Sequence, residues 1–259
     1  RAIEMDPEYA IAYAGHADSY SWYNMYWDSS DEPLQQAEES SRKALELAPD
    51  LAEAHVSHGL AVSLRGRYDE AETDFNRAIE LNPRLFEAYY FYARSVFAEG
   101  DLERAAELFL KAADLRPEDY QVPALLAVVY RGLEQPENVI ASSQRLLELA
   151  ENHLKRNPKD VRATYFRAGA LAELGRAEEA IESAKLALEM EPDDPAVLYN
   201  VACIHAAVGK LSEATGFLER AVEVGFSHLE WIENDADLDP LRDQPRFRQL
   251  VEKLQEQKN

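Results

Sequence analysis

Residues 55–117 decide the fold: HVSHGLAVSLRGRYDEAETDFNRAIELNP is followed by RLFEAYYFYARSVFAEGDLERAAELFLKAADLRP. The second part repeats the first at a period of about 34 residues. Bulky and small residues return at the same offsets, as shown by the pairs His55 and Tyr89, Gly66 and Gly100, Phe75 and Phe109, and Pro83 and Pro117. A period of this length predicts an array of stacked helical hairpins.

Small residues and prolines recur where the hairpin needs them. Helices approach to roughly 8–10 Å only where the contacting side chains are small, and the positions that meet this need are Ala71, Ala78, Ala105, Ala112, Ala180, Ala187, Ala214 and Ala221. Glycine suits a left-handed residue between paired helices, and it stands at Gly66, Gly100, Gly175 and Gly209. Proline ends the second helix of most units because it cannot continue a helix.

This pattern resembles the tetratricopeptide repeat family. The resemblance implies an all-α, right-handed superhelical solenoid of about six helix-turn-helix repeats with a C-terminal capping helix. We expect residues 8–226 to form the array and residues 227–259 the cap. Residues 1–7 match residues 77–83, the end of a second helix, so we expect them to be the tail of a truncated upstream repeat.

Two units depart from the regular length. The first carries roughly eight extra residues between its helices. The second helix of the fourth unit, from Pro136 to about Asn157, is some two turns longer than its neighbours. We expect this long helix to change the curvature of the superhelix and to project beyond its neighbours near Leu149 to Lys155.

The composition limits the class of protein. Asp and Glu number 49 against 27 Lys and Arg, a formal net charge of -22. A surface of that sign repels phosphate backbones, so we expect no nucleic-acid partner. The acidic residues either decorate solvated faces or favour basic partners. A lone cysteine, Cys203, fits a reducing compartment, and no apolar run is long enough to span a bilayer. We therefore expect a cytoplasmic protein without membrane insertion.

Sequence motifs for catalysis are absent: there is no GxSxG, no HExxH, no paired CxxC and no phosphate-binding glycine loop. His55 and His58 could share a metal, but both occupy bulky repeat positions where a packed, hydrogen-bonded histidine is the alternative. We interpret Cys203 as a small core residue. The run Asp235–Asp239 lacks the glycine and terminal glutamate of a calcium loop. We expect no enzymatic activity, no cofactor and no metal.

The family resemblance also implies a binding surface. In tetratricopeptide proteins the first helices line the concave face, where ligands lie between the packing positions. By register, this groove holds Val56, Leu60, Leu64, Tyr90, Phe91, Arg94, Phe97, Arg131, Arg162, Tyr165, Tyr199 and Asn200. Aromatic and arginine side chains dominate binding hot spots, so we expect a peptide or protein segment to bind there. The alternative is that some aromatics pack inward and the arginines pair with nearby glutamates.

The arginines suggest the chemistry of the ligand. They lie in a strongly acidic chain and could hold a carboxylate-bearing peptide through forked hydrogen bonds. The family's carboxylate clamp is not matched, however, because its groove positions hold Ala14, Asp18, Val56 and Leu60.

A second candidate surface lies in the first repeat, whose first helix is crowded by Tyr20, Trp22, Tyr23, Met25, Tyr26 and Trp27. Of these, Trp22, Tyr23 and Tyr26 point away from the expected core face. They either form a docking patch for a partner, a second copy of the chain included, or pack on the connection near Asp28 to Asp31 or on an upstream helix.

The C-terminal tail is atypical, as end units of solenoids are. Apolar residues at helical spacing predict a capping helix: Phe247, Leu250, Val251 and Leu254. The segment from Trp231 to Phe247 is similar to the ending of tetratricopeptide modules in bacterial signalling proteins, where such arrays follow a nucleotide cyclase, a serine/threonine kinase or a winged-helix regulator. We interpret the chain as a non-catalytic protein-binding module of such a protein, with a homodimerisation module as the alternative.

Overall fold

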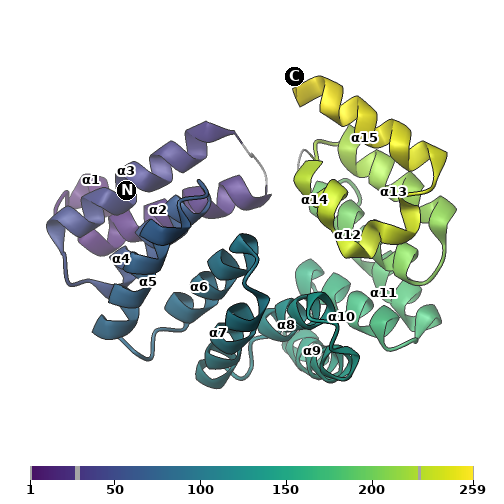
Figure 1. Cartoon of the computed structure of the whole chain (residues 1–259), viewed down its shortest axis with the longest axis horizontal. Coiled ribbons are helices and arrows are strands. Elements are labelled where there is room, and N and C mark those ends of the chain that lie inside the picture. The colour runs from purple at the N-terminus through teal and green to yellow at the C-terminus, as the bar shows by residue number, and fades with distance from the viewer. Residues whose placement is uncertain (1, 27–29, 227–228, 259) are drawn as a thin grey trace. The chain divides into compact units, whose positions relative to one another are not determined.

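The computed structural model describes residues 2–26, 30–226 and 229–258. Within these residues all regular structure is helical and no strand occurs. The chain forms two compact units, Arg1–Pro136 and Glu137–Asn259. Figure 1 labels the helices of both units in chain order.

The first unit contains eight helices among the described residues: α1 (Ala2–Met5), α2 (Ala10–Tyr26), α3 (Asp31–Leu47), α4 (Ala52–Ser63), α5 (Tyr68–Leu81), α6 (Phe86–Glu99), α7 (Leu102–Leu115) and α8 (Gln121–Gly132). They pack as hairpins, α2 with α3, α4 with α5 and α6 with α7. First helices of neighbouring hairpins also touch, α2 with α4 and α4 with α6. The first helices therefore form one continuous row.

The second unit follows the same plan with α9 (Pro136–Arg156), α10 (Val161–Glu173), α11 (Ala177–Met190), α12 (Pro195–Ala207) and α13 (Leu211–Glu223). Here α10 pairs with α11, α12 pairs with α13, and the first helices α10 and α12 touch. Helix α9 begins at the last residue of the first unit and otherwise belongs to the second. The expected all-α array of paired helices is confirmed within each unit.

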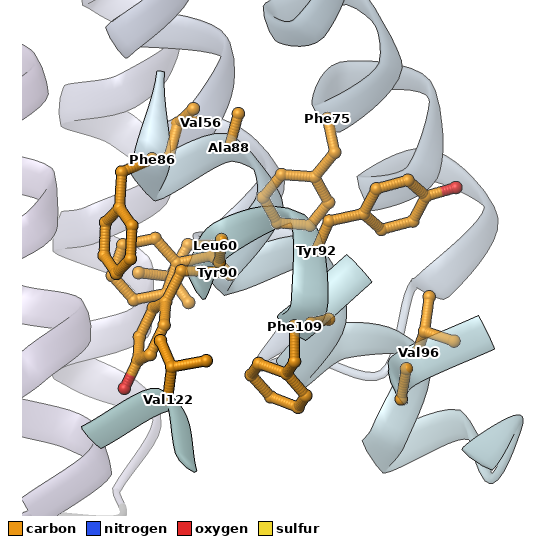
Figure 2. Close-up of a cluster of buried hydrophobic side chains, with 14 of the residues drawn as sticks. Val56, Leu60, Phe75, Phe86, Ala88, Tyr90, Tyr92, Val96, Phe109 and Val122 are labelled. Carbon is orange, nitrogen blue, oxygen red and sulfur yellow. The ribbon is translucent and has the colours of Figure 1, made fainter. Parts of the chain in front are cut away.

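Small residues set the spacing inside each hairpin. The eight alanines that the sequence assigns to helix contacts, from Ala71 to Ala221, are all 0% exposed. Gly59 shows how tight the contact is, because a Cβ atom there would lie 3.0 Å from Cε1 of Phe75. Figure 2 shows the Phe75 ring beside that of Tyr92, and the two rings stack with centroids 5.3 Å apart.

Replacing one of these alanines tests the packing. We expect Ala105→Leu to lower the free energy of unfolding by about 1–3 kcal/mol, because the added methyl groups overpack a full contact. Lys111→Leu, on the exposed side of the same helix, is the control and should change stability by less than about 0.5 kcal/mol. Chemical denaturation measures both, and equal stabilities would contradict the assigned contact.

The turn inside a hairpin needs a left-handed residue. Gly66, Gly100, Gly175 and Gly209 all have positive φ, as the sequence predicts. The α8–α9 connection has Glu134 at this place in the period, with φ 55°. This non-glycine left-handed residue was not anticipated.

The strain at this turn can be measured. We expect Gly100→Ala to lower the free energy of unfolding by about 1–2 kcal/mol, the cost of a left-handed L-residue. A Cβ atom at Gly100 would meet nothing within 4 Å, so the loss would reflect backbone conformation rather than a clash. Glu134→Gly should act in the opposite direction, by less than about 1 kcal/mol because glycine also gains entropy on unfolding. Denaturant titration of both variants measures the free energy of unfolding. A Gly100→Ala variant as stable as the unaltered chain would contradict the prediction.

The irregular units depart from expectation in detail. In the first repeat the extra residues lengthen the helices themselves, since α2 and α3 have 17 residues each against 12 in α4 and 14 in α5. Helix α9 is long, with 21 residues. Its far end does not simply project, because Leu149 and Ala150 are buried and Glu151 pairs with Arg167 of α10. The expectation of a projecting end from Leu149 onward is wrong.

The C-terminal residues cover the last hairpin. Helix α14 (Leu229–Asn234), the 3-10 helix η1 (Ala236–Leu241) and helix α15 (Pro245–Lys258) follow α13. Phe247, Leu250 and Leu254 are buried in one cluster with residues of α12 and α13, and Val251 packs against it. The predicted capping helix is confirmed.

Candidate functional site

Aromatic side chains of α2 cover the row of first helices in the first unit. The Trp22 ring stacks on that of Tyr26, with centroids 5.2 Å apart, and meets the Phe91 ring of α6 edge-on at 6.1 Å. Because α4 touches both α2 and α6, these side chains reach across α4. The extra length of α2 is what brings Tyr26 to this place.

This arrangement changes the expected groove. The structure buries several side chains that the register places on the open face: Val56, Leu60, Tyr90, Phe91, Tyr165 and Tyr199. In the first unit they belong to a core cluster against which Trp22 and Tyr26 pack. Figure 2 shows Tyr90 beside Phe86, and their rings stack at 5.3 Å. For these residues the alternative applies, in which some of the aromatic side chains pack inward.

The remaining groove candidates retain some exposure. Phe97 is 36% exposed, whereas those of intermediate exposure are Leu64, Arg94, Arg131, Arg162 and Asn200. Asn200 donates a hydrogen bond to the carbonyl of Ala196 in its own helix, 2.8 Å away. Phe97 follows Arg94 by three residues, so both project from the same side of α6.

Arg94 has an unusual environment. Its Nη1 lies 3.4 Å from the Tyr26 hydroxyl and 3.4 Å from the Tyr90 hydroxyl, and donates to both. Burial acts to lower the pKa of Arg94, but Tyr26 and Tyr90 raise it, and the net shift is upward. The guanidinium is therefore charged. Among the described residues it forms no ion pair.

The alternative docking patch is divided by the structure. Trp22 and Tyr26 pack on the core of the first unit, whereas Tyr23 is 47% exposed. Trp27 lies outside the described residues. Part of the surplus aromatic area is thus used within the chain, where Trp22 meets Phe91 of α6.

Asp18, one turn before Trp22 on α2, has a buried carboxylate. Its Oδ1 atom is enclosed and has no hydrogen-bond partner. Burial raises the pKa of Asp18 to about 6, Ser57 partly opposes the shift, and Glu87 adds to it. The pKa of Asp18 in the folded state is above the usual value of 3.8. Ionisation of this carboxyl at neutral pH therefore lowers the free energy of unfolding.

This carboxylate makes stability depend on pH. The folded state binds the Asp18 proton more tightly, so its destabilising effect is absent below about pH 4 and complete above about pH 6. We expect Asp18→Asn to raise the free energy of unfolding at pH 7.5 by up to about 3 kcal/mol and to have little effect at pH 4. Urea titration at both pH values measures this. Glu107→Gln, at an exposed position, is the control, and a gain that does not vary with pH would contradict the assignment.

The two histidines of the second repeat are hydrogen-bonded, as one alternative predicted. Asp74 of α5 lies between them, with Oδ1 at 2.9 Å from His55 Nδ1 and Oδ2 at 2.6 Å from His58 Nδ1. The bond to Asp74 raises the pKa of His55. Burial would raise the pKa of Asp74, but the two histidines outweigh it and the pKa is lowered. The three side chains hold α4 to α5.

A second polar cluster joins α12 to the cap. The Tyr199 hydroxyl donates to Asp235 Oδ2 at 2.6 Å, and Asp235 Oδ1 accepts from the backbone N–H of Asp237 at 2.9 Å. Cys203, Asp235 and Asp237 could each offer a ligand atom within 4.8 Å of the others. Both Asp235 oxygens are already engaged in hydrogen bonds that anchor η1. Burial raises the pKa of Cys203, so its thiol is protonated and a poor metal ligand.

Comparison with known proteins agrees with the repeat architecture. The sequence model described as "Tetratricopeptide repeat" matches residues 34–84, 59–120 and 146–195, together more than half of the chain. The chain belongs to the tetratricopeptide repeat family. None of the curated proteins compared matches the sequence.

Several solved structures align with the chain. TTC0263, a thermophilic tetratricopeptide protein of Thermus thermophilus, aligns with a TM-score of 0.54 at 24% identity over 79% of this chain and 98% of that chain. The APC/C hetero-tetramer Cut9–Hcn1 aligns with a TM-score of 0.62 at 17% identity over 93% of this chain and 44% of that chain. YrrB, described as a tetratricopeptide protein with an unusual peptide-binding site, aligns with a TM-score of 0.45 at 23% identity over 73% of this chain and 94% of that chain.

Within the part of the chain that the structure describes, no helix combines the length and the apolar character needed to cross a membrane.

Proposed function

We propose that this chain is a non-catalytic scaffold that binds a peptide or protein segment along the row of first helices α2, α4 and α6. The tetratricopeptide fold is a scaffold for protein–protein interaction. What supports this face is Phe97, because it is the most exposed of the predicted groove residues, whereas Tyr90 and Phe91 of the same helix are buried. An exposed aromatic next to a charged arginine is the composition of a binding hot spot.

Self-association is the second candidate. It is supported by exposed apolar residues at the start of the chain, where Met5, Tyr9, Ile11 and Tyr23 are 42–78% exposed. Exposed apolar side chains mark an interaction surface where they form one continuous patch. Light scattering over a range of concentrations tests it, and a monomer at all concentrations would exclude this candidate.

The cellular setting is also a proposal. The tail from Trp231 to Phe247 supports a place in a larger bacterial signalling or regulatory protein, and sequencing of the surrounding reading frame tests this. The net charge of -22 supports a protein that avoids nucleic acid, and the lone cysteine supports a reducing compartment such as the cytoplasm.

Peptide selection tests the proposed face. A random peptide library is selected on the immobilised chain, and the affinity of the enriched peptides is measured by titration. We expect Phe97→Ala to weaken binding by about tenfold or more, as loss of a hot-spot aromatic does. Leu110→Ala removes a side chain of similar exposure, 47%, from the second helix α7 and should leave affinity unchanged.

The reverse result, with affinity lost for Leu110→Ala and kept for Phe97→Ala, would place binding on the second helices and contradict the proposal. Failure of any peptide to enrich would contradict peptide binding altogether.

A further inference from the structure

The arginines of this chain differ in how their charge is compensated. Most form ion pairs with carboxylates, as Arg104 does with Glu72 and Arg116 with Glu87. Arg84 and Arg156 form none among the described residues, but both are exposed to water. Arg94 also lacks a carboxylate there, yet it is partly buried. A buried arginine is normally paired with a carboxylate. Arg94 therefore differs from the usual case.

The geometry of Arg94 leaves one edge of its guanidinium open. Both hydrogen bonds to Tyr26 and Tyr90 come from Nη1. Nε and Nη2 donate to no atom among the described residues. Neither of them appears among the enclosed side-chain atoms that lack a partner, whereas Asp18 Oδ1 does. Nε and Nη2 are therefore reached by solvent, and together they form a fork that can donate one hydrogen bond to each oxygen of a carboxylate.

The two tyrosines hold the fork in place. Tyr90 is 4% exposed and stacks on Phe86, while Tyr26 stacks on Trp22. Rings fixed by packing cannot follow the guanidinium, so their hydroxyls orient it before any ligand arrives. Preorganisation of this kind lowers the entropy lost on binding.

We propose that Nε and Nη2 of Arg94 bind the side-chain carboxylate of an aspartate or glutamate in the partner segment. The inference rests on the proposed function and specifies its ligand. A single carboxylate fits better than a phosphate, because a chain of net charge -22 repels a doubly charged anion more strongly.

An internal side chain fits better than a chain terminus. Arg94 is flanked by α4 on one side, and on the other Tyr90 shares a core cluster with Val122 and Leu126 of the next first helix, α8. A segment that crosses this row can continue on both sides of α6. Phe97, one turn further along α6, would then contact a neighbouring residue of the same segment.

The guanidinium itself reports on this site. In the full chain, the Nε–H resonance of Arg94 is followed by NMR at low ionic strength while N-acetyl-glutamate α-amide is added. We expect a saturable shift with this probe and a response at least about tenfold weaker with the neutral isostere N-acetyl-glutamine α-amide. N-acetyl-alanine supplies a terminal carboxylate and N-acetyl-phosphoserine amide a phosphate, and both should shift the resonance less.

Two variants complete the test. For the variants, the same titration is followed through the backbone amide resonance of Phe97, one turn further along α6: Arg94→Gln should abolish its glutamate-selective shift and Arg84→Gln should retain it. The NMR measurement on the unaltered chain stands even where Arg94→Gln fails to fold. An equal shift with the glutamine probe, or a stronger one with the terminal carboxylate or the phosphate, would overturn the inference. If the resonance does not respond while selected peptides still bind through Phe97, the inference fails and the proposed function stands.

Discussion

Close approach of the two helices of each hairpin is the constraint on which the rest of the structure depends. Gly59 leaves room for the Phe75 ring and no more, and Ala71 and Ala105 are fully enclosed. A larger side chain at these places would separate the helices, and close packing in the interior cannot absorb that change. The hairpin therefore has one register. Because the hairpins of one unit share this register, the first helices within that unit fall into a row and present corresponding positions to the same side.

What that row presents is decided by α2 rather than by the repeat itself. Its long first helix carries more aromatic area than one packing face needs, and Trp22 and Tyr26 bury that area across α4 against α6. Burial of apolar surface contributes about 25 cal/mol per Å², so a filled groove is favoured over an open one. Among the predicted groove residues, the face that remains has polar and charged side chains of intermediate exposure and one exposed ring, Phe97. Recognition on such a face depends on the placement of few groups.

The sequence predicts well what depends on local spacing. Paired helices, enclosed alanines, left-handed glycines and the capping helix all follow from periodic residue types. Contacts over long separations do not: Arg94 meets Tyr26 across 68 positions, and Tyr199 meets Asp235 across 36. The repeat register predicts which face of a helix a residue lies on. It does not predict which side chain of a neighbouring helix extends over that face and covers it. For the same reason, groove positions such as Val56 and Leu60 could be placed on the row but not recognised as covered. The left-handed conformation of Glu134 could not be predicted, because the residue is not a glycine and only its backbone angle reveals it.

The arginines of this acidic chain have two kinds of environment within the described residues: most are paired with a carboxylate, and Arg94 is not. Repulsion among the many carboxylates opposes the compact state. Arginines that pair with carboxylates of other helices offset it, as Arg104 of α7 does with Glu72 of α5 and Arg246 of α15 with Glu219 of α13. Arg94 has no such carboxylate partner among the described residues. Exposed carboxylates more than about 8–10 Å away are screened at physiological ionic strength, so their repulsion at the open edge of its guanidinium is weakened, and what remains is smaller for a singly charged anion than for a doubly charged one. Short-range geometry decides there, and a fork oriented by two packed tyrosines allows an acidic scaffold to attract an anion at one point while repelling anions elsewhere.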